Sequence, residues 1–207
     1  MKPISGKVSI MGKSYKEVYK QIAYIPQTTT VNWNFPTTVI DVVTMGRYAG
    51  LGLFKRVNAS EKEKALEALK KMKMEDFASR QISELSGGQK RRVAIAGVLA
   101  MNPEVLILDE PTAGLDPKGR DELFDEIIEL KKSRDMTVIL VSHSMEDVAK
   151  YVDRLLVMNA GELVLDRTPK DVFKKYKYLD SIGLSAPGIT YIVERLKKEG
   201  IDLGDDI

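Results

Sequence analysis

The chain has 207 residues, 43% of them hydrophobic and 30% charged, which is typical of a folded protein of one or two domains. Its 32 basic and 30 acidic residues nearly balance, so charge alone gives no reason to expect binding to nucleic acid. The absence of cysteine excludes a disulfide scaffold, a thiolate metal site and a cysteine nucleophile. No apolar stretch approaches the ~20 residues that span a bilayer and no signal peptide opens the sequence, so we expect a cytosolic protein.

The chain is expected to begin with two short strands. Lys7–Met11 and Ile22–Ile25 are the candidates, divided by a polar stretch, and a loop follows to about Pro36. From Thr37 the spacing of the valine residues becomes helical. Ser60–Glu63 has the pattern of a capping box, in which a serine hydroxyl and a glutamate carboxylate bind backbone N–H groups at the start of a helix.

After Arg80, short apolar strands alternate with helices. The expected elements are a helix at 86–101, a strand at 105–108, a helix at 118–132, a strand at 137–141, a helix at 145–151, paired strands at 154–158 and 162–164, and helices at 170–178 and 189–198. Asn159-Ala160-Gly161 is a candidate turn for the strand pair. Fully apolar strands between helices indicate a parallel sheet covered on both faces. We therefore expect an α/β fold into which the helical residues 37–85 are inserted.

Two adjacent carboxylates follow one of these strands. Asp109 and Glu110 come directly after Val105–Leu108, at the carboxyl end of the strand, where open α/β sheets bind ligands. Such a pair suits phosphoryl transfer, because one carboxylate can hold Mg²⁺ and the other can orient the attacking water. The alternative is a strand followed by a solvated acidic turn, and this segment alone leaves both interpretations open.

A serine and two glycines open the helix that precedes this strand. In Leu85-Ser86-Gly87-Gly88-Gln89 the serine can cap the helix, and the glycines let backbone N–H groups approach a phosphate at its positive end. Taken alone, such a string is more often a loop. However, Pro111–Asp116 follows the two carboxylates, and this order and spacing of motifs resembles the ATP-binding subunits of ABC transporters.

The resemblance covers essentially the whole chain. It rests on the signature Leu85–Gln89, the Walker B strand Val105–Asp109 with Glu110, the D-loop Ala113–Asp116, the switch histidine His143, and Gln27 of the Q-loop. It implies a fold of the P-loop NTPase (RecA-like) type, a parallel sheet with a helical insertion. It also implies ATP and Mg²⁺ as cofactors, and a second ABC ATPase subunit (homo- or heterodimer) and a transmembrane permease subunit as partners. The chain itself would then lie at the cytoplasmic face of the cell membrane as a peripheral protein.

The resemblance assigns roles to individual residues. Of the expected catalytic residues, Glu110 orients the water, His143 contacts the γ-phosphate, and Gln27 reaches the metal and couples the site to the membrane subunit. Asp109 and Gln27 are the expected metal residues. The expected nucleotide-binding residues are Ser86, Gly87, Gly88, Gln89 and Asp116, the last of which also contacts the partner subunit. Without the resemblance, a lone histidine is most often structural and Gln27 is an ordinary polar residue after a strand.

Two further groups have competing interpretations. We interpret Lys90-Arg91-Arg92 as a solvated helix face near a phosphate, in preference to a nucleic acid site. Trp33 and Phe35 have no strand or helix period that would bury them, so they either dock on a transmembrane subunit or pack on the helical insertion.

The phosphate-binding loop, G-x-x-x-x-G-K-[ST] between a strand and a helix, is missing from the sequence. Gly6 to Gly12-Lys13-Ser14 comes close, but five residues separate the glycines, and Met1–Ser5 is too short for the strand that must precede them. We interpret Lys2–Gly6 as the end of the helix that follows this loop in the family. The fold is therefore expected to lack the N-terminal phosphate-loop strand and helix, which would impair ATP binding.

This interpretation divides the chain into three parts. Residues 1–36 and 86–168 form an α/β core that is incomplete at its N-terminus, 37–85 form a helical subdomain that ends in the signature, and 169–207 form a C-terminal helical tail. In the family the phosphate-loop strand lies beside the strand at 137–141. Its absence leaves that strand with an open apolar edge, which either recruits another chain or is covered by a rearranged N-terminal region such as Lys7–Met11.

Resemblances at the subfamily level point in two directions. One set of segments is similar to subunits of manganese, zinc and iron importers, namely Val31–Val39, Asp41–Val43 and Met45–Arg47. A second set is similar to cobalt and vitamin importers of the energy-coupling-factor type, namely Arg91–Leu99, Asp116–Arg120 and Ser181–Leu184. A chimera joined near the signature and a single lineage with mixed features both explain this. The expected function is the ATP-hydrolysing subunit of an importer of transition metal ions, and the alternative is a non-catalytic chimeric or truncated fragment that acts as a scaffold or trans partner.

Overall fold

The computed structural model describes residues 5–27, 33, 35–48 and 58–201, so Val31, Asn32 and Asn34 of the importer-like segment lie outside the described residues. The chain forms two compact units, which divide between Val141 and Ser142. In the described part of the chain, no helix is long and apolar enough to cross a membrane. The predicted division into a core, a helical subdomain and a tail stays a prediction.

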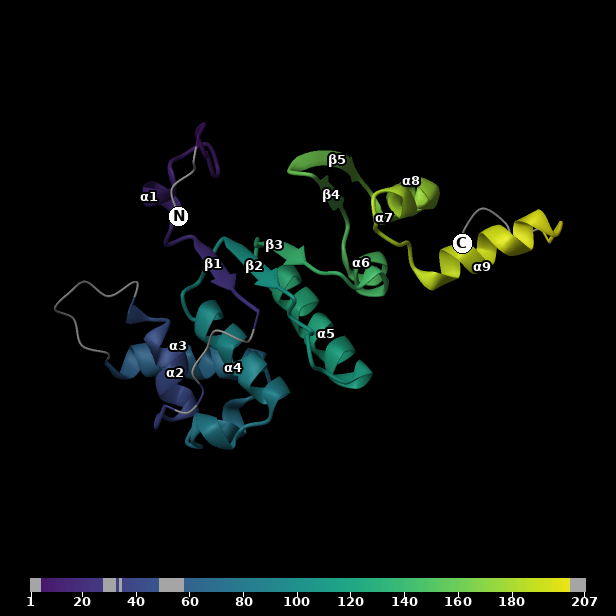
Figure 1. Ribbon diagram of the computed structural model, residues 1–207. Coiled ribbons are helices and arrows are strands. Elements are labelled where there is room, and N and C mark those ends of the chain that lie inside the picture. Colours follow the sequence, from purple (N-terminus) through teal and green to yellow (C-terminus); the bar gives the residue numbers. More distant parts are fainter. Residues whose placement is uncertain (1–4, 28–32, 34, 49–57, 202–207) are drawn as a thin grey trace. The chain divides into compact units, whose positions relative to one another are not determined.

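A three-stranded parallel sheet organises the first unit. Its strands are β1 (Ile22–Ile25), β2 (Val105–Asp109) and β3 (Thr137–Val141), in the order β1-β2-β3 (Figure 1). Ala23 pairs with Leu106 and Leu106 pairs with Val138, so the strands are in register across the sheet. The predicted α/β fold with a parallel sheet is therefore confirmed.

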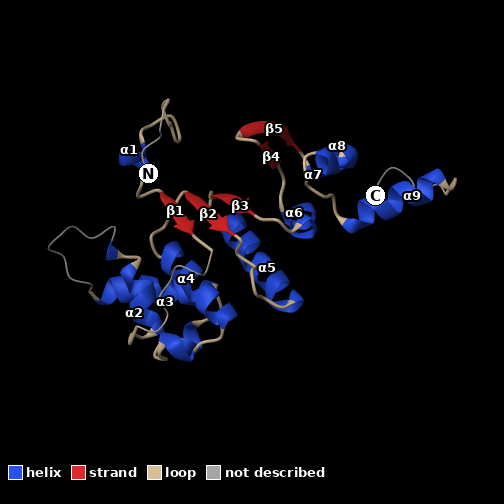
Figure 2. Ribbon diagram, viewed as in Figure 1, coloured by secondary structure: helices blue, strands red, loops and turns tan. Residues whose placement is uncertain are grey.

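The two faces of this sheet have different surroundings. Residues that are buried on one face are Ala23, Ile25, Leu106 and Leu108. Helix α4 (Gly87–Leu99) packs against β1, and α5 (Pro117–Ser133) lies on the same side of the sheet (Figure 2). On the opposite face, Tyr24, Ile139 and Val141 are 53%, 45% and 49% exposed. The expectation that helices cover both faces is thus wrong for the described residues.

Helices α2 (Val39–Met45) and α3 (Ala59–Lys71) and two short 3₁₀ helices, Glu75–Phe77 and Ile82–Glu84, lie between β1 and α4 in the chain. Helix α2 packs against both α3 and α4, and Val39, Val43 and Leu69 are buried in this contact region. At the end of α2 the approach to α4 is close. A Cβ atom built on Gly46 would lie 1.9 Å from the carbonyl oxygen of Gly97, so only glycine at position 46 permits this contact.

The predicted capping box at Ser60 is wrong. Helix α3 begins two residues earlier than this cap would require, at Ala59. Asn58 is its N-cap, and the side-chain oxygen of Asn58 accepts a hydrogen bond from the Glu61 N–H at 3.0 Å. The Asn58 side chain thus satisfies a free amide of the first helical turn. Ser60 is left inside the first turn, where its hydroxyl is not needed as a cap.

The predicted strand at Lys7–Met11 is also wrong. Ile10 and Lys13 exchange two backbone hydrogen bonds of 2.9 Å around Met11 and Gly12, which have left-handed φ angles of 53° and 76°. A four-residue helix, α1 (Tyr15–Val18), follows this turn within the stretch that we expected to be polar loop. A lone pair of strand residues is marginal without neighbours to pack on. Lys7–Met11 is therefore largely exposed, with Ile10 partly buried, and does not pair with β3.

The second unit contains an antiparallel hairpin and helices of five to eleven residues. Its elements are α6 (Met145–Tyr151), β4 (Leu155–Asn159), β5 (Glu162–Arg167), α7 (Pro169–Phe173), α8 (Tyr176–Ser181) and α9 (Gly188–Lys198). The predicted hairpin turn is confirmed, because Ala160 and Gly161 have left-handed φ angles of 48° and 84° between β4 and β5. The helix expected at 170–178 is divided into α7 and α8.

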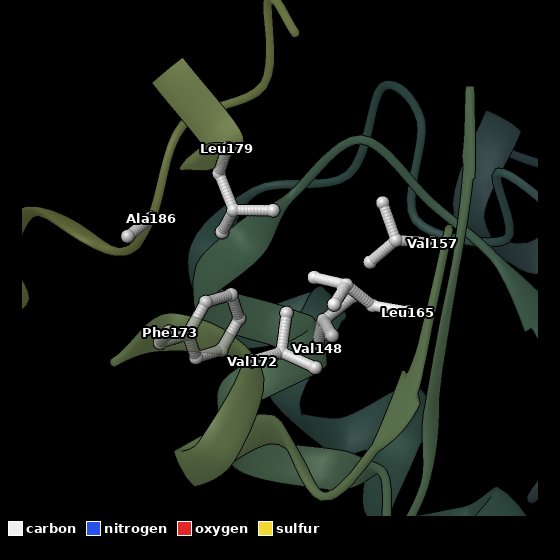
Figure 3. Close-up of a cluster of buried hydrophobic side chains, with 7 residues drawn as sticks. All are labelled: Val148, Val157, Leu165, Val172, Phe173, Leu179 and Ala186. Carbon is white, nitrogen blue, oxygen red and sulfur yellow. The ribbon is translucent and has the colours of Figure 1, made fainter. Parts of the chain in front are cut away.

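Apolar side chains from several of these elements form the core of the second unit. Figure 3 shows Val148 of α6, Val157 and Leu165 of the hairpin, Val172 and Phe173 of α7, Leu179 of α8, and Ala186. Outside this core, Arg154 and Asp166 form a two-pronged ion pair across the hairpin, with N···O distances of 2.7 and 2.6 Å. The second unit therefore has its own small hydrophobic core.

The outer edge and the exposed face of β3 predict self-association. In the described part of the chain β3 pairs only with β2, and open apolar edges recruit other strands. We expect the mass measured by light scattering during gel filtration to rise with protein concentration. Ile139→Lys should weaken this association, because it places a charge on the apolar face.

Ile189→Lys is the matched control, since Ile189 is similarly exposed but lies on α9. It should leave the association unchanged. A chain that stays monomeric at every concentration would contradict the prediction, as would an equal effect of the two lysine variants.

Candidate functional site

The carboxyl ends of β1 and β2 bring three expected site residues to one edge of the sheet. Ile25, the last residue of β1, pairs with Leu108, and Gln27 follows two residues later. Asp109 is the last residue of β2, and Glu110 comes directly after it. In a parallel sheet such strand ends meet at the same edge, where ligands of open α/β sheets bind.

The carboxylate of Asp109 is held by a tyrosine that the sequence did not single out. Tyr24 Oη donates a hydrogen bond of 2.9 Å to Asp109 Oδ2. This bond raises the pKa of Tyr24, chiefly because the carboxylate accepts the phenolic proton. Tyr24 pairs with Ile107, two residues before Asp109, so strand alternation puts both side chains on one face. That alternation is the signal by which Tyr24 could have been found.

The backbone of Glu110 is left-handed, with φ of 47°. Such a conformation costs about 1–2 kcal/mol for a residue other than glycine. The Glu110 N–H donates to the carbonyl of Val141 at 2.9 Å, which ties the turn after β2 to the end of β3. The neighbouring strand therefore helps to fix the direction in which the chain leaves Asp109.

The expected cap of α4 is confirmed. The Ser86 N–H donates to Gln89 Oε1 at 2.9 Å, and the Gln89 N–H donates to Ser86 Oγ at 3.3 Å. Gly87 and Gly88 are then the first two helical residues, whose amides have no acceptor within a helix. A Cβ atom on Gly88 would lie 3.1 Å from Leu115 Cδ2, so glycine allows the loop after Glu110 to approach closely.

Two other expected site residues are Asp116 and His143. Asp116 is the N-cap of α5, and its carboxylate accepts a hydrogen bond of 3.3 Å from the Gly119 N–H. This capping role was not foreseen, and contact with a partner subunit stays a prediction. His143 belongs to the second unit, where it is exposed on the segment before α6.

The interpretation of Lys90-Arg91-Arg92 as a solvated face is wrong for both arginines. Arg91 is only 3% exposed, and its Nη1 and Nη2 atoms donate to the carbonyl oxygens of Pro26 and Asp109, each at 2.9 Å. Arg92 binds Glu122 of α5 at 2.7 Å. Arg91 stands on the same stripe of α4 as the buried Ile95 and Leu99, and this helical spacing is the signal that the sequence carried.

A small apolar cavity of about 190 Å³ lies beside the end of β1. It is lined by Tyr24, Ile25, Pro26, Trp33, Arg91, Ala94 and Val98. Trp33 is half-buried in this lining, whereas Phe35 is 58% exposed. Packing inside the chain therefore accounts for the partial burial of Trp33. Docking on a transmembrane subunit stays a prediction for Phe35.

The residues at the sheet edge fit a nucleotide-bound magnesium ion better than a metal held by protein alone. In the residues that the structure describes, no group of three or more histidine or acidic side chains is placed to hold a metal. Mg²⁺ in phosphoryl-transfer sites needs only one or two carboxylates, because phosphates and water supply the remaining ligands. Asp109 at the end of β2 offers such a carboxylate.

Gly12-Lys13-Ser14 does not form a phosphate loop in the structure. The Lys13 N–H, which would face the phosphates in such a loop, donates to the Ile10 carbonyl in a tight turn. The four-residue helix α1 after it is also far shorter than the helix that follows a phosphate loop. The described residues thus offer magnesium ligands and a capped signature helix, but not this phosphate cradle.

Comparison with known proteins identifies the family. The sequence model of the ABC transporter family matches residues 1–113. The chain is 44% identical to the energy-coupling factor transporter ATP-binding protein EcfA2 of Clostridium tetani over 212 residues, which cover all of this chain and 73% of that protein. It is 41% identical to the manganese transport system ATP-binding protein MntB of Halalkalibacterium halodurans over 178 residues, 84% of this chain and 71% of that protein.

Solved structures agree. The structure of cbiO1 from Clostridium perfringens, part of the ABC transporter complex cbiONQ, superimposes with a TM-score of 0.74 at 32% identity and covers 94% of this chain and 78% of that one. The chain also spans 64% of one chain of an inward-facing ABC transporter, with a TM-score of 0.72. The chain therefore belongs to the ABC transporter family of ATP-binding subunits. Members of this family bind ATP with Mg²⁺, hydrolyse it, and work in pairs with a transmembrane permease.

The contacts of Arg92 predict how α4 is anchored to α5. Arg92 Nε and Lys73 Nζ each lie 3.6 Å from a carboxylate oxygen of Glu126, which is 2% exposed. Burial raises the pKa of Glu126, and the two cations oppose this shift. Arg92→Met should lower the free energy of unfolding near neutral pH by about 3 kcal/mol, because it leaves the buried carboxylate of Glu126 with one of its two cations.

The loss should shrink as the pH is lowered. The folded-state pKa of Glu126 lies above its unfolded value, so the folded chain binds the proton more readily and acid favours it over the unfolded chain at this residue. Urea unfolding of both proteins at about pH 7.5 and about pH 5 measures this difference. Lys118→Met is the control, since exposed Lys118 lies 3.9 Å from Glu122 and should matter little. A loss that does not vary with pH would refute the role of Glu126.

Proposed function

We propose that the chain is an ATP-binding subunit of an importer of the energy-coupling-factor type, and that it presents its signature helix to ATP held by a partner subunit. The observation that carries this proposal is the start of α4. Ser86 and Gln89 cap each other there, and the first-turn amides of Gly87 and Gly88 stay without helical acceptors. Backbone N–H groups at the positive end of a helix attract phosphate oxygens.

The residues at the sheet edge take the roles that the family resemblance implies. Asp109 would hold Mg²⁺, which neutralises phosphate charge when it is bound. Glu110 orients the attacking water, and its fixed left-handed backbone supports a defined direction for the side chain. Gln27 at the end of β1 reaches the metal and the water, His143 contacts the γ-phosphate, and Asp116 contacts the partner subunit.

Residues 1–207 by themselves are expected to bind ATP weakly, because the described residues contain no phosphate loop. Such a loop supplies several charge-assisted hydrogen bonds of ~1.5–3 kcal/mol each. The loss of three removes at least ~4.5 kcal/mol, about three decades of affinity at ~1.4 kcal/mol per decade. ATP hydrolysis by the isolated chain should be correspondingly slow.

Titration of the isolated chain with labelled ATP and Mg²⁺ measures this weakness. We expect a dissociation constant about three decades above that of an intact family member measured in the same way. Binding of equal strength would show that the chain holds the phosphates by other residues, and the impaired site would then be rejected.

The cargo is proposed from the relatives. Similarity to the energy-coupling-factor proteins extends over the entire chain, so one lineage explains the sequence without a chimera. The MntB protein, named for manganese transport, matches 84% of the chain at 41% identity and keeps a transition metal ion as the second candidate. In either case the subunit would lie at the cytoplasmic face of the membrane, where exposed Phe35 is available to a permease.

The trans role is tested by mixing the chain with an intact ATP-binding subunit of the energy-coupling-factor type. Added chain should change the ATP turnover of the intact subunit, because each site of a head-to-tail pair combines one phosphate loop with the other signature. Ser86→Arg should abolish this change, since the long side chain blocks the approach of the γ-phosphate. Ser60→Arg is the matched control on the exposed first turn of α3 and should behave like the parent chain.

Two results would overturn the trans role. One is a mixture whose turnover does not respond to the chain, and the other is a response that Ser86→Arg leaves intact. The chain would then be better described by the alternative, a non-catalytic fragment that serves as a scaffold.

A further inference from the structure

Arg91 joins three segments of the candidate site. It lies on α4, five residues after the capping Ser86. Its Nη1 atom donates to the carbonyl of Pro26, directly before Gln27, and its Nη2 atom donates to the carbonyl of Asp109, directly before Glu110. Both distances are 2.9 Å. One guanidinium group therefore links the signature helix to the chain that leaves β1 and to the chain that leaves β2.

Packing alone does not explain an arginine at this position. Arg91 is 3% exposed, and its Nε atom is buried with no hydrogen-bond acceptor among the described residues. Burial lowers the pKa of Arg91, while the nearby Asp109 charge opposes this shift. An isolated charge in the protein interior is costly, and an apolar side chain of similar volume is often tolerated better. The neighbouring Arg92, in contrast, binds a carboxylate directly.

The two acceptors explain what the guanidinium group contributes. Pro26 lies one residue beyond β1, so its carbonyl falls outside the ladder that joins β1 to β2. The planar guanidinium carries donors in a fixed fork, which binds two acceptors at once with little further loss of freedom. Arg91 thus fixes the distance between two chain ends that the sheet by itself leaves free to diverge.

We propose that Arg91 is a positioning residue, which holds the segment bearing Gln27 at a fixed place relative to Asp109 and Glu110 and ties both to the signature helix. The inference rests on the proposed function for the role of those three residues, but the geometric link does not. When the segment after β1 is displaced, Arg91 passes the displacement to the end of β2 and to α4. The positions of Gln27 and Ser86 then change together.

The test uses the full chain, which has no cysteine and one tryptophan. A nitroxide label on Gln27→Cys reports the mobility of the segment after β1, and a label on Lys118→Cys at the start of α5 serves as the reference. Trp33 lines the same cavity as Arg91, so its fluorescence reports whether water enters there. Each label is measured in the parent chain, in Arg91→Met, in Arg91→Lys and in Arg92→Met.

We expect Arg91→Met to remove the immobilised component of the spectrum at position 27 and to shift Trp33 emission to longer wavelength. The label at position 118 should not change. Arg91→Lys keeps the charge and a donor and should restore part of the immobilised component. Arg92→Met, which breaks the ion pairs to α5, should lower stability to urea but leave the label at 27 and Trp33 as in the parent chain.

The proposal is overturned if the label at position 27 stays immobilised in Arg91→Met, or if Arg92→Met mobilises it equally, since general destabilisation would then be the cause. If Arg91→Met does not fold, the comparison of Arg91→Lys with Arg92→Met decides, and an unchanged spectrum in Arg91→Lys overturns the proposal. None of these measurements uses ATP or a partner subunit. Failure of the proposed trans function is therefore distinguishable from failure of this inference.

Discussion

The in-register parallel pairing of β1, β2 and β3 is the constraint on which the rest of the first unit depends. Successive side chains of a strand point to opposite faces, so a slip of one residue would exchange the two faces of a strand. Leu106 and Leu108 are buried on the helical side, and this places Asp109 on the other face beside Tyr24. The register that buries the two leucines therefore also brings Asp109 and Glu110 to the carboxyl ends of the strands.

Much of this arrangement could be predicted from short-range patterns. The apolar runs at 105–108 and 137–141 are strands, and Ser86 caps α4, because both features depend on residues close in sequence. Lys7–Met11 was predicted wrongly because a strand needs a neighbouring strand to pair with, and the residue pattern of the segment does not show whether such a strand is present. At the start of α3 the sequence pattern predicted Ser60 as the cap, but asparagine caps a helix as well as serine does, and the structure has Asn58 at the N-cap.

Arg91 escaped prediction for a different reason. A run of three basic residues is usually solvated, yet the position of Arg91 on the buried stripe of α4 takes its side chain under the ends of β1 and β2. There the fixed positive charge of Arg91 lies near the charge of Asp109. Long-range contacts of this kind cannot be inferred from local composition, because the acceptors are backbone carbonyls that every residue carries.

The contact between Gly46 and Gly97 has a mechanical consequence. At this one point no side chain separates the two backbones, so the end of α2 cannot move closer to α4. A force applied to α2 is therefore passed directly to α4, whose thirteen residues form a stiff rod of about 20 Å. Ser86 stands at the far end of that rod. A displacement of α2 is therefore transmitted along α4 to the signature residues at its start.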